Sequence, residues 1–107
     1  MNKPTEAHLN LARNVLRYLK GTKDHKLCYS SSEHPLTVIG FCDSDWAGSE
    51  DRKSISGYGF KLCEDGPLIS WKSKKQNIVI LCSCEAEYTA LTFASQEGKF
   101  VSQIFAA

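Results

Sequence analysis

The sequence has no long hydrophobic run. Its longest unbroken apolar stretch, Ile78–Cys82, has five residues, whereas a membrane-spanning helix needs roughly 20. The first residues, Met1-Asn2-Lys3-Pro4, lack the apolar segment that is typical of a signal peptide. We therefore expect neither a membrane span nor secretion.

The chain also lacks a large excess of charge of either sign. Its 13 basic and 12 acidic residues give a formal net charge of +1, so contact with nucleic acid would require a local basic patch. The 107 residues are 42% hydrophobic and 23% charged, which is typical of one small globular domain. A disordered, collagen-like or coiled-coil chain is excluded.

Cysteine is sparse and odd in number, which argues against a disulfide framework. The five cysteines include Cys82-x-Cys84, but no second pair of cysteines or histidines has a spacing suited to zinc. Four of the five lie in apolar runs, which predicts reduced, buried thiols in a cytosolic or nuclear compartment. The histidines are scattered in polar surroundings and are assigned no role.

The first segment has the spacing of an amphipathic helix. Pro4 and Thr5 supply a start, and Gly21 supplies a stop. A short strand candidate follows at Leu27–Ser30. The apolar residues that share one face of the expected helix are Leu9, Ala12, Val15, Leu16 and Leu19.

The middle of the chain predicts three strands in an antiparallel meander. Thr37–Asp43 is almost entirely apolar, which is typical of a strand covered on both faces. A loop or bulged strand end at Ser44–Ser54 leads to strands at Ile55–Cys63 and Leu68–Lys72. The Asp-Gly pair between these two strands predicts a tight hairpin over Glu64–Pro67.

The last segment is a second predicted helix. Ser83 is a candidate N-cap, and Glu85 lies in the first turn, where the helix dipole favours a carboxylate. Gly98 weakens the middle of this helix by roughly 1 kcal/mol relative to alanine. The apolar residues at helical spacing are Ala86, Ala90, Phe93, Ala94, Val101 and Ile104.

Carboxylates at the first strand and the last helix are candidates for chemistry. Asp43 and Asp45 would point to one face of a continuing strand, and a carboxylate that leaves a core needs a cation such as Mg²⁺ or hydrogen-bond donors. Alternatively, Asp43 only caps the following loop. Glu87 borders the apolar stripe of the helix, whereas Glu85 lies about 200° around it. Glu87 either lines a site or lies on a solvated flank.

Basic residues flank two of the predicted strands. Lysines interleaved with an aromatic residue suit a phosphate backbone, but they are also ordinary solubilising residues at strand ends. The candidates for nucleic-acid binding are Arg52, Lys53, Trp71, Lys72, Lys74 and Lys75.

Together, these motifs resemble the ribonuclease H region of the Pol polyprotein of copia-type LTR retrotransposons. They occur in the order of that family and cover nearly the whole chain. The matching stretches are Leu16–Thr22, Asp43–Gly48, Asp51–Tyr58, Ile69–Gln76 and Glu85–Tyr88.

The resemblance implies an α+β chain with a partial ribonuclease H-like fold, in which a three-stranded antiparallel meander and a helix follow an N-terminal helix. Residues 1–26 would be the C-terminal helix of the reverse transcriptase or its connection region. Residues 27–107 would be the first half of a ribonuclease H-like domain. The family hydrolyses the RNA strand of RNA–DNA hybrids during reverse transcription, in cytoplasmic virus-like particles, with the nucleus as a second location.

The resemblance also implies a metal site. The family's first two metal-binding carboxylates map to Asp43 and Glu87, which would be catalytic and would hold Mg²⁺ or Mn²⁺. Two such ions, about 4 Å apart, activate water and stabilise the leaving oxygen. The implied partners are an RNA–DNA hybrid, recognised by backbone shape and 2′-hydroxyls, and the rest of the Pol polyprotein. Neither a membrane nor a small-molecule cofactor is expected.

The chain departs from the family in ways that lower the expected activity. The third and fourth carboxylates and the later strands are absent, and Cys82 and Cys84 stand where the family usually has serine and threonine. We therefore expect a fragment or a degenerate transposon-derived frame that is inactive alone. The alternatives are a non-catalytic product that binds nucleic acid or protein, and a non-functional remnant.

Overall fold

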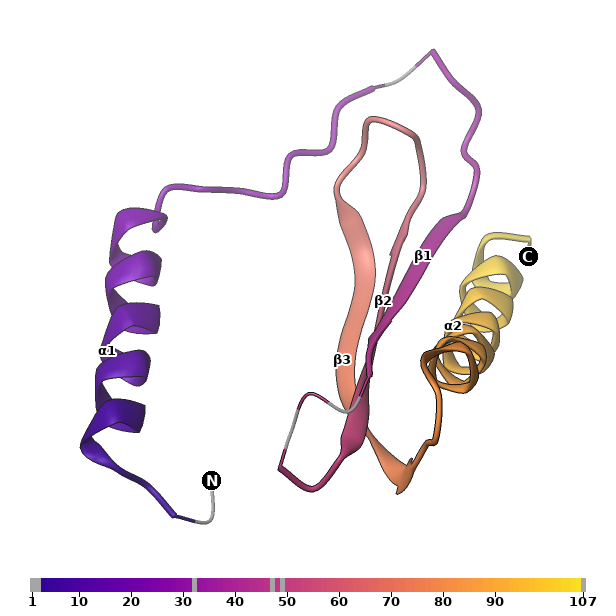
Figure 1. Cartoon of the computed structure of the whole chain (residues 1–107). Coiled ribbons are helices and arrows are strands. Elements are labelled where there is room, and N and C mark those ends of the chain that lie inside the picture. Colours follow the sequence, from indigo (N-terminus) through magenta and orange to yellow (C-terminus); the bar gives the residue numbers. More distant parts are fainter. Residues whose placement is uncertain (1–2, 32, 47, 49, 107) are drawn as a thin grey trace.

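The computed structural model describes the whole chain except residues 1–2, 32, 47, 49 and 107. It has an N-terminal helix, a three-stranded antiparallel sheet and a C-terminal helix (Figure 1), so the predicted α+β class is confirmed. The elements are α1 (Glu6–Gly21), β1 (Ile39–Asp45), β2 (Lys53–Lys61), β3 (Leu68–Val79) and α2 (Ser83–Ala106). Neither described helix is long and apolar enough to cross a bilayer.

Local signals define both ends of α1. The Thr5 side chain accepts a hydrogen bond from the backbone N–H of His8 at 3.4 Å, and His8 Nδ1 accepts one from the Thr5 N–H at 3.0 Å. This is a capping box with histidine in place of the usual glutamate or glutamine. The helix ends at Gly21, after which the Thr22 N–H donates to the Tyr18 carbonyl at 3.0 Å. His8, which the sequence left without a role, therefore helps to fix the start of α1.

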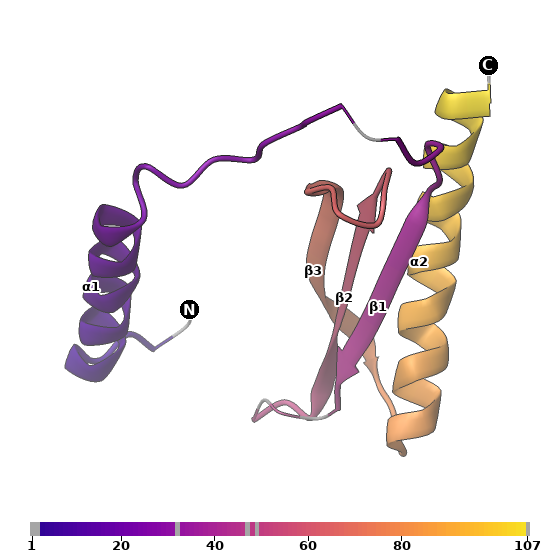
Figure 2. The ribbon, with the colours of Figure 1, turned by 90° about the horizontal axis from the view of Figure 1, so that it is seen from above.

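α1 contacts no other described helix or strand, and none of its residues is buried. Leu16, on its apolar face, is 66% exposed. In Figures 1 and 2 the sheet lies between α1 and α2, and a long extended segment joins α1 to the sheet. The radius of gyration is accordingly 17.3 Å, compared with about 13 Å for a compact chain of 100 residues.

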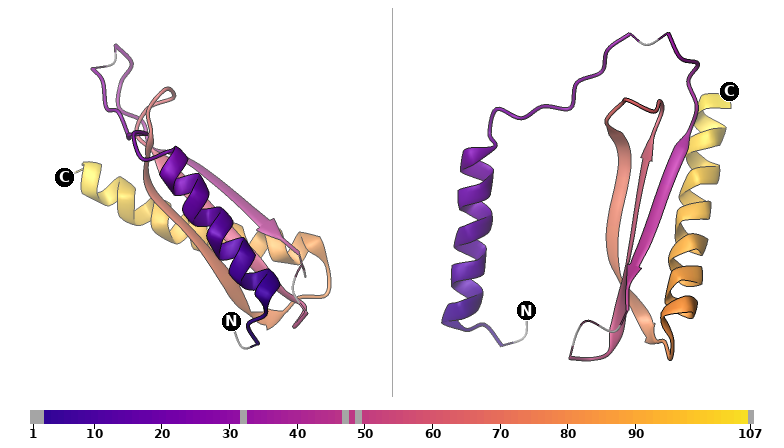
Figure 3. Two further views of the ribbon diagram at one scale, coloured as in Figure 1. Left: turned by 90° about the vertical axis from the view of Figure 1, so that its left-hand side faces the viewer. Right: turned by 45° about the horizontal axis from the view of Figure 1, so that its top comes forward.

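The sheet has the order β1-β2-β3, with both neighbouring pairs antiparallel. Asp45 of β1 pairs with Ile55 of β2, and Lys61 at the other end of β2 pairs with Leu68 of β3. The predicted meander is therefore confirmed. Its second turn is closed by a hydrogen bond from the Gly66 N–H to the Cys63 carbonyl at 3.2 Å. The right-hand view of Figure 3 shows the three strands side by side.

Several strand predictions are wrong in detail. Leu27–Ser30 is not a strand, because no described sheet edge supplies the backbone partners that a strand needs. β3 does not end at Lys72 but continues to Val79, since backbone pairing does not require apolar side chains. The loop predicted over residues 44–54 includes Ala47 and Ser49, which lie outside the described residues.

β1 is not covered on both faces, as its apolar sequence predicted. Five of its seven residues are exposed, because only the face toward α2 packs against another described element. The prediction of buried cysteines fails for a related reason. All five cysteines are free, but four are exposed and Cys63 is partly exposed, since the apolar runs that hold them lie at edges and ends of the sheet or outside it.

The core lies between α2 and one face of the sheet. Phe60 of β2 is 6% exposed, and its ring lies beside Gly40 of β1 and Gly98 of α2. A Cβ atom at Gly98 would lie 3.1 Å from the ring, so the small residue allows close packing of helix and sheet. The remaining buried apolar residues are Ile80, Ala86, Ala90, Ala94 and Val101.

Helix α2 begins at Ser83 itself, and the Ala86 N–H donates to the Cys82 carbonyl at 3.3 Å. Ser83 is therefore the first helical residue rather than the predicted N-cap. This shift by one residue moves the start of α2 without changing which face packs on the sheet.

Candidate functional site

Asp43 and Glu87 line the same pocket, between the edge of β1 and the N-terminal part of α2. The pocket has a volume of about 500 Å³, and its other lining residues are Cys42, Cys84, Tyr88 and Leu91. Asp43 lies near the end of β1, and Glu87 lies one turn into α2. The two residues come together because α2 packs against β1, which is an edge strand of the described sheet.

The pocket is lined by two acidic residues that are exposed to solvent. Both Asp43 and Glu87 are exposed, and carboxylate oxygens are the ligands that Mg²⁺ and Mn²⁺ take in proteins. Within the described residues, no group of three or more histidine, cysteine, aspartate or glutamate side chains could hold a metal ion. The two acidic residues could therefore supply only part of the ligands of one ion, with water completing the set, and they could not supply those of a pair of ions.

The neighbouring carboxylates do not line this pocket. The Asp45 carboxylate lies against Gly48, with Oδ2 2.9 Å from the position that a Cβ atom would take there. Glu85 also lies outside the lining residues, as expected from its angular separation from Glu87 around the helix. Asp43 rather than Asp45, and Glu87 rather than Glu85, thus line the pocket.

Two side chains tie the region around Asp43 to the start of α2. The Trp46 indole N–H donates to the Ile80 carbonyl at 3.1 Å. The Gln76 amide donates to Ser56 Oγ at 2.7 Å and to the Ala86 carbonyl at 3.2 Å. Sequence reasoning missed both contacts. The available signal was that the polar group of a tryptophan or glutamine near a core needs a partner.

The predicted basic residues do not form one patch. Lys72 and Lys74 lie on the α2 side of the sheet and line a second pocket of about 250 Å³ together with Tyr58 and Glu97. Burial, and then the negative charge of Glu97, raise the pKa of Tyr58 above its ordinary value of 10.0. Glu97 also accepts a hydrogen bond from Ser70 Oγ at 2.6 Å.

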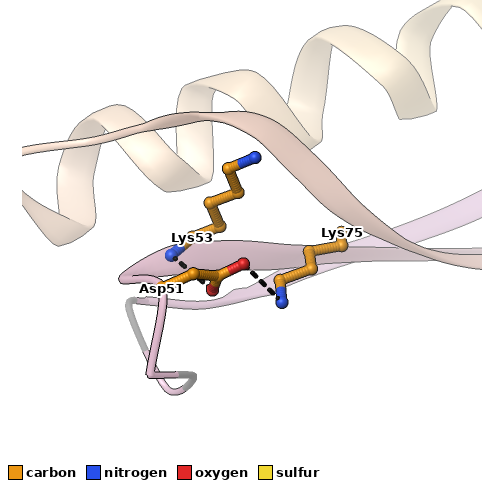
Figure 4. Close-up of polar contacts among 3 residues, drawn as sticks. All are labelled: Asp51, Lys53 and Lys75. Carbon is orange, nitrogen blue, oxygen red and sulfur yellow. Dashed lines mark hydrogen bonds and ion pairs between the residues drawn. The ribbon is translucent and has the colours of Figure 1, made fainter. Parts of the chain in front are cut away.

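Lys75 and Trp71 lie on the opposite face of the sheet from Lys72 and Lys74, because side chains alternate along β3. Lys75 Nζ lies 2.7 Å from Asp51 Oδ2, and Asp51 Oδ1 accepts a hydrogen bond from the Lys53 N–H at 3.3 Å (Figure 4). Both charged side chains of this ion pair are nearly half exposed, so its contribution to stability is small.

Arg52 lies between Asp51 and Lys53 in the chain. Its φ of 57° is a left-handed conformation that is uncommon for residues other than glycine. The six predicted nucleic-acid-binding residues are therefore divided between two faces of the sheet and the β1–β2 loop. Their role in binding nucleic acid stays a prediction.

The chain is similar to proteins of two kinds, namely retrotransposon Pol polyproteins and a secreted effector protein. It is 41% identical over 98 residues to the retrovirus-related Pol polyprotein from transposon TNT 1-94 of Nicotiana tabacum, and 38% identical over 105 residues to that from transposon RE2 of Arabidopsis thaliana. It is also 42% identical over 100 residues to secreted RxLR effector protein 161 of Plasmopara viticola. The chain is thus similar to a segment of retrotransposon Pol polyproteins.

These matches differ in how much of each relative they cover. They include 91% of this chain for the tobacco protein, 97% for the Arabidopsis protein and 92% for the Plasmopara protein. The chain covers 68% of the Plasmopara protein but only 7% of each of these two Pol polyproteins. No family model matches the chain, and no solved structure matches it. The chain therefore corresponds to one short segment of the Pol polyproteins.

Proposed function

We propose that the chain is the ribonuclease H segment of a retrotransposon Pol polyprotein, with Asp43 and Glu87 as metal ligands. The observation that carries this proposal is their presence in one pocket, one from a strand end and one from the following helix. The relationship to Pol polyproteins supports it independently. The substrate is the RNA strand of an RNA–DNA hybrid.

One Mg²⁺ or Mn²⁺ ion would be held by Asp43 from the β1 side of the pocket and by Glu87 from the α2 side. When bound, the metal supplies an activated water and stabilises the leaving oxygen of the cleaved phosphodiester. Asp43 and Glu87 bind and orient the ion, and the β1–α2 packing keeps them together. The described residues provide only these two acidic ligands, so this chain alone is proposed to be inactive.

The proposal extends to the organisation of the chain. Residues 1–26 are the end of the reverse transcriptase or its connection region, and residues 27–107 are the first half of a ribonuclease H-like domain. The separation of α1 from the sheet and α2 supports a boundary between them. The partners are the hybrid and the rest of the polyprotein, in a cytoplasmic particle or in the nucleus.

A chimeric enzyme tests this proposal. This chain replaces the matching segment of the tobacco Pol polyprotein, and cleavage of an RNA–DNA hybrid is measured in Mg²⁺. Asp43→Asn and Glu87→Gln are each expected to lower the rate by about 100-fold or more, because each removes a ligand charge at the reacting phosphate. The matched controls, Asp45→Asn and Glu85→Gln, are expected to retain most of the rate.

The 107-residue chain is measured in the same assay and is expected to show no cleavage above background. Robust cleavage by the chain alone, lost on Asp43→Asn, would show that it assembles a working site. Equal rates for the Asp43 and Asp45 variants of the chimera would overturn the assigned site.

A second candidate function is non-catalytic binding of nucleic acid or protein. The face of the sheet away from α2 favours it, because Phe41 and Trp71 are 58% and 61% exposed there and flank Gly59 in the strand register. This function would be supported by an inactive chimera together with hybrid binding by the chain that Asp43→Asn does not change. A chain that fails to fold would instead indicate a degenerate remnant.

A further inference from the structure

Gln76 lies in a buried polar cluster beneath the first turn of α2. It is 3% exposed, and its amide nitrogen donates both to Ser56 Oγ at 2.7 Å and to the Ala86 carbonyl at 3.2 Å. Ser56 is 4% exposed and pairs across the sheet with Ser44 of β1. One side chain from β3 thus links the central strand to the helix.

Two residues of this cluster are direct chain neighbours of the two candidate metal ligands. Ala86, whose carbonyl accepts the hydrogen bond, directly precedes Glu87 in the chain. Ser44, opposite Ser56, directly follows Asp43. The amide of Gln76 therefore joins the backbone next to Glu87 to the strand pair that carries Asp43, without lining the pocket itself.

The cluster is poorly explained by stability alone. Gln76 Oε1 and Ser44 Oγ are buried with no hydrogen-bond partner among the residues that the structure describes. A buried polar atom without a partner destabilises the fold, so these two atoms lower the net stability that the cluster provides. What the glutamine provides, and a methionine would not, is a directional contact with the helix backbone.

We propose that Gln76 is a positioning residue that holds α2 so that Glu87 lines the same pocket as Asp43. This inference rests on the proposed function, because it concerns the geometry of the same metal site. Metal binding is sensitive to such support, and loss of a side chain that orients a ligand typically weakens it about 10-fold or more. Trp46 forms the other tether, but its partner, Ile80, lies before the helix begins.

Binding of Mn²⁺ to the full chain tests the inference. Paramagnetic broadening of backbone amide NMR signals locates the ion, and titration gives its Kd. In the wild-type chain, broadening is expected to centre on Asp43 and Glu87 and to be lost in Asp43→Asn. Gln76→Met keeps the length and burial of the side chain but removes its donors, and is expected to raise the Kd about 10-fold or more.

Gln103→Met is the matched control, because Gln103 is exposed near the end of α2, and its Kd is expected to equal that of the wild type. The urea midpoint of Gln76→Met is expected to fall, because Ser56 and the Ala86 carbonyl lose their donor, so the Kd is measured without urea, where circular dichroism must show the variant to be folded.

An unchanged Kd in Gln76→Met would overturn the positioning role while leaving Asp43 and Glu87 as ligands. Failure of that variant to fold would also overturn it, because Gln76 would then act on the fold as a whole. Wild-type broadening that does not centre on the two carboxylates would overturn the metal site and the inference with it.

Discussion

The two helices of this chain are stabilised in different ways. α1 has a capping box at Thr5 and a lysine in its last turn, but no buried residue. α2 carries Gly98 in its middle, yet Ala86, Ala90, Ala94 and Val101 are buried against the sheet. An isolated helix of about 15 residues is only marginally stable in water. Local signals are therefore the only described support for α1, whereas tertiary packing supports α2.

This difference separates the two proposed functional parts. The sheet and α2 form one packed unit that brings Asp43 and Glu87 to one pocket. α1 presents its apolar face to solvent and contributes nothing to that pocket. A substitution in the packed unit should therefore change stability and the site together, whereas the same kind of substitution in α1 should change neither.

The largest expected effect is that of truncating the core aromatic residue. Phe60→Ala should lower the free energy of unfolding of the sheet and α2 by about 3–5 kcal/mol, because it leaves a cavity between Gly40 and Gly98. Leu16→Ala in α1 should change the same quantity by less than about 0.5 kcal/mol, because Leu16 is 66% exposed. Urea unfolding monitored by tryptophan fluorescence measures both changes. Similar losses for the two variants would contradict the comparison.

A smaller effect is expected from adding a methyl group at two glycines. Gly40→Ala should destabilise the sheet and α2 by about 1–3 kcal/mol, because the new Cβ would overlap the Phe60 ring. At Gly21 a new Cβ atom would have no neighbour within 4 Å. Gly21→Ala should instead raise the helix content of α1, since alanine is favoured over glycine in helices by up to about 1 kcal/mol. Circular dichroism and urea unfolding distinguish the two. Destabilisation by Gly21→Ala would indicate a contact of α1 that the structure does not show.

The smallest expected effect concerns alkaline pH. The pKa of Tyr58 is raised in the fold by burial and by Glu97, so the folded state holds the phenolic proton more tightly than the unfolded state. The contribution to stability is therefore fully present below about pH 10 and is lost as the pH rises through the raised pKa. Tyr58→Phe should flatten this decline, and Tyr18→Phe on α1 should leave it unchanged. The difference between wild-type and variant unfolding midpoints from pH 9 to 11 measures it. A decline that persists in Tyr58→Phe would assign it to other groups.

Much of the fold could be predicted from the sequence because its signals are local. The spacing of apolar residues gave α1 and α2, and the Asp-Gly turn with its flanking apolar segments gave the meander. The errors occur where a residue's environment depends on distant parts of the chain. Leu27–Ser30 has the composition of a strand but no described partner, and Cys42 lies in an apolar run but is exposed at a sheet edge.

In the candidate site, too, the features that follow from local periodicity could be predicted, and those that depend on distant residues could not. Asp43 and Glu87 could be chosen from the sequence, because position in a strand and angle around a helix are periodic properties. The separation of Lys72 and Lys74 from Trp71 and Lys75 also follows from alternation, once the strand is known to be continuous. The contacts of Gln76 could not be predicted, because they join β3 to a strand and a helix across the core.

The amino-acid sequence by itself determined the element types, the antiparallel order and the relationship to retrotransposon Pol polyproteins, since these depend on residue spacing and on motifs that lie in a fixed order. Only the tertiary structure decided that α1 stands apart, that β1 is covered on one face, that Asp43 and Glu87 line one pocket, and that Gln76 links β2 to α2. The physical reason is that burial and hydrogen bonding across the core depend on which surfaces meet in space, and local periodicity does not specify that.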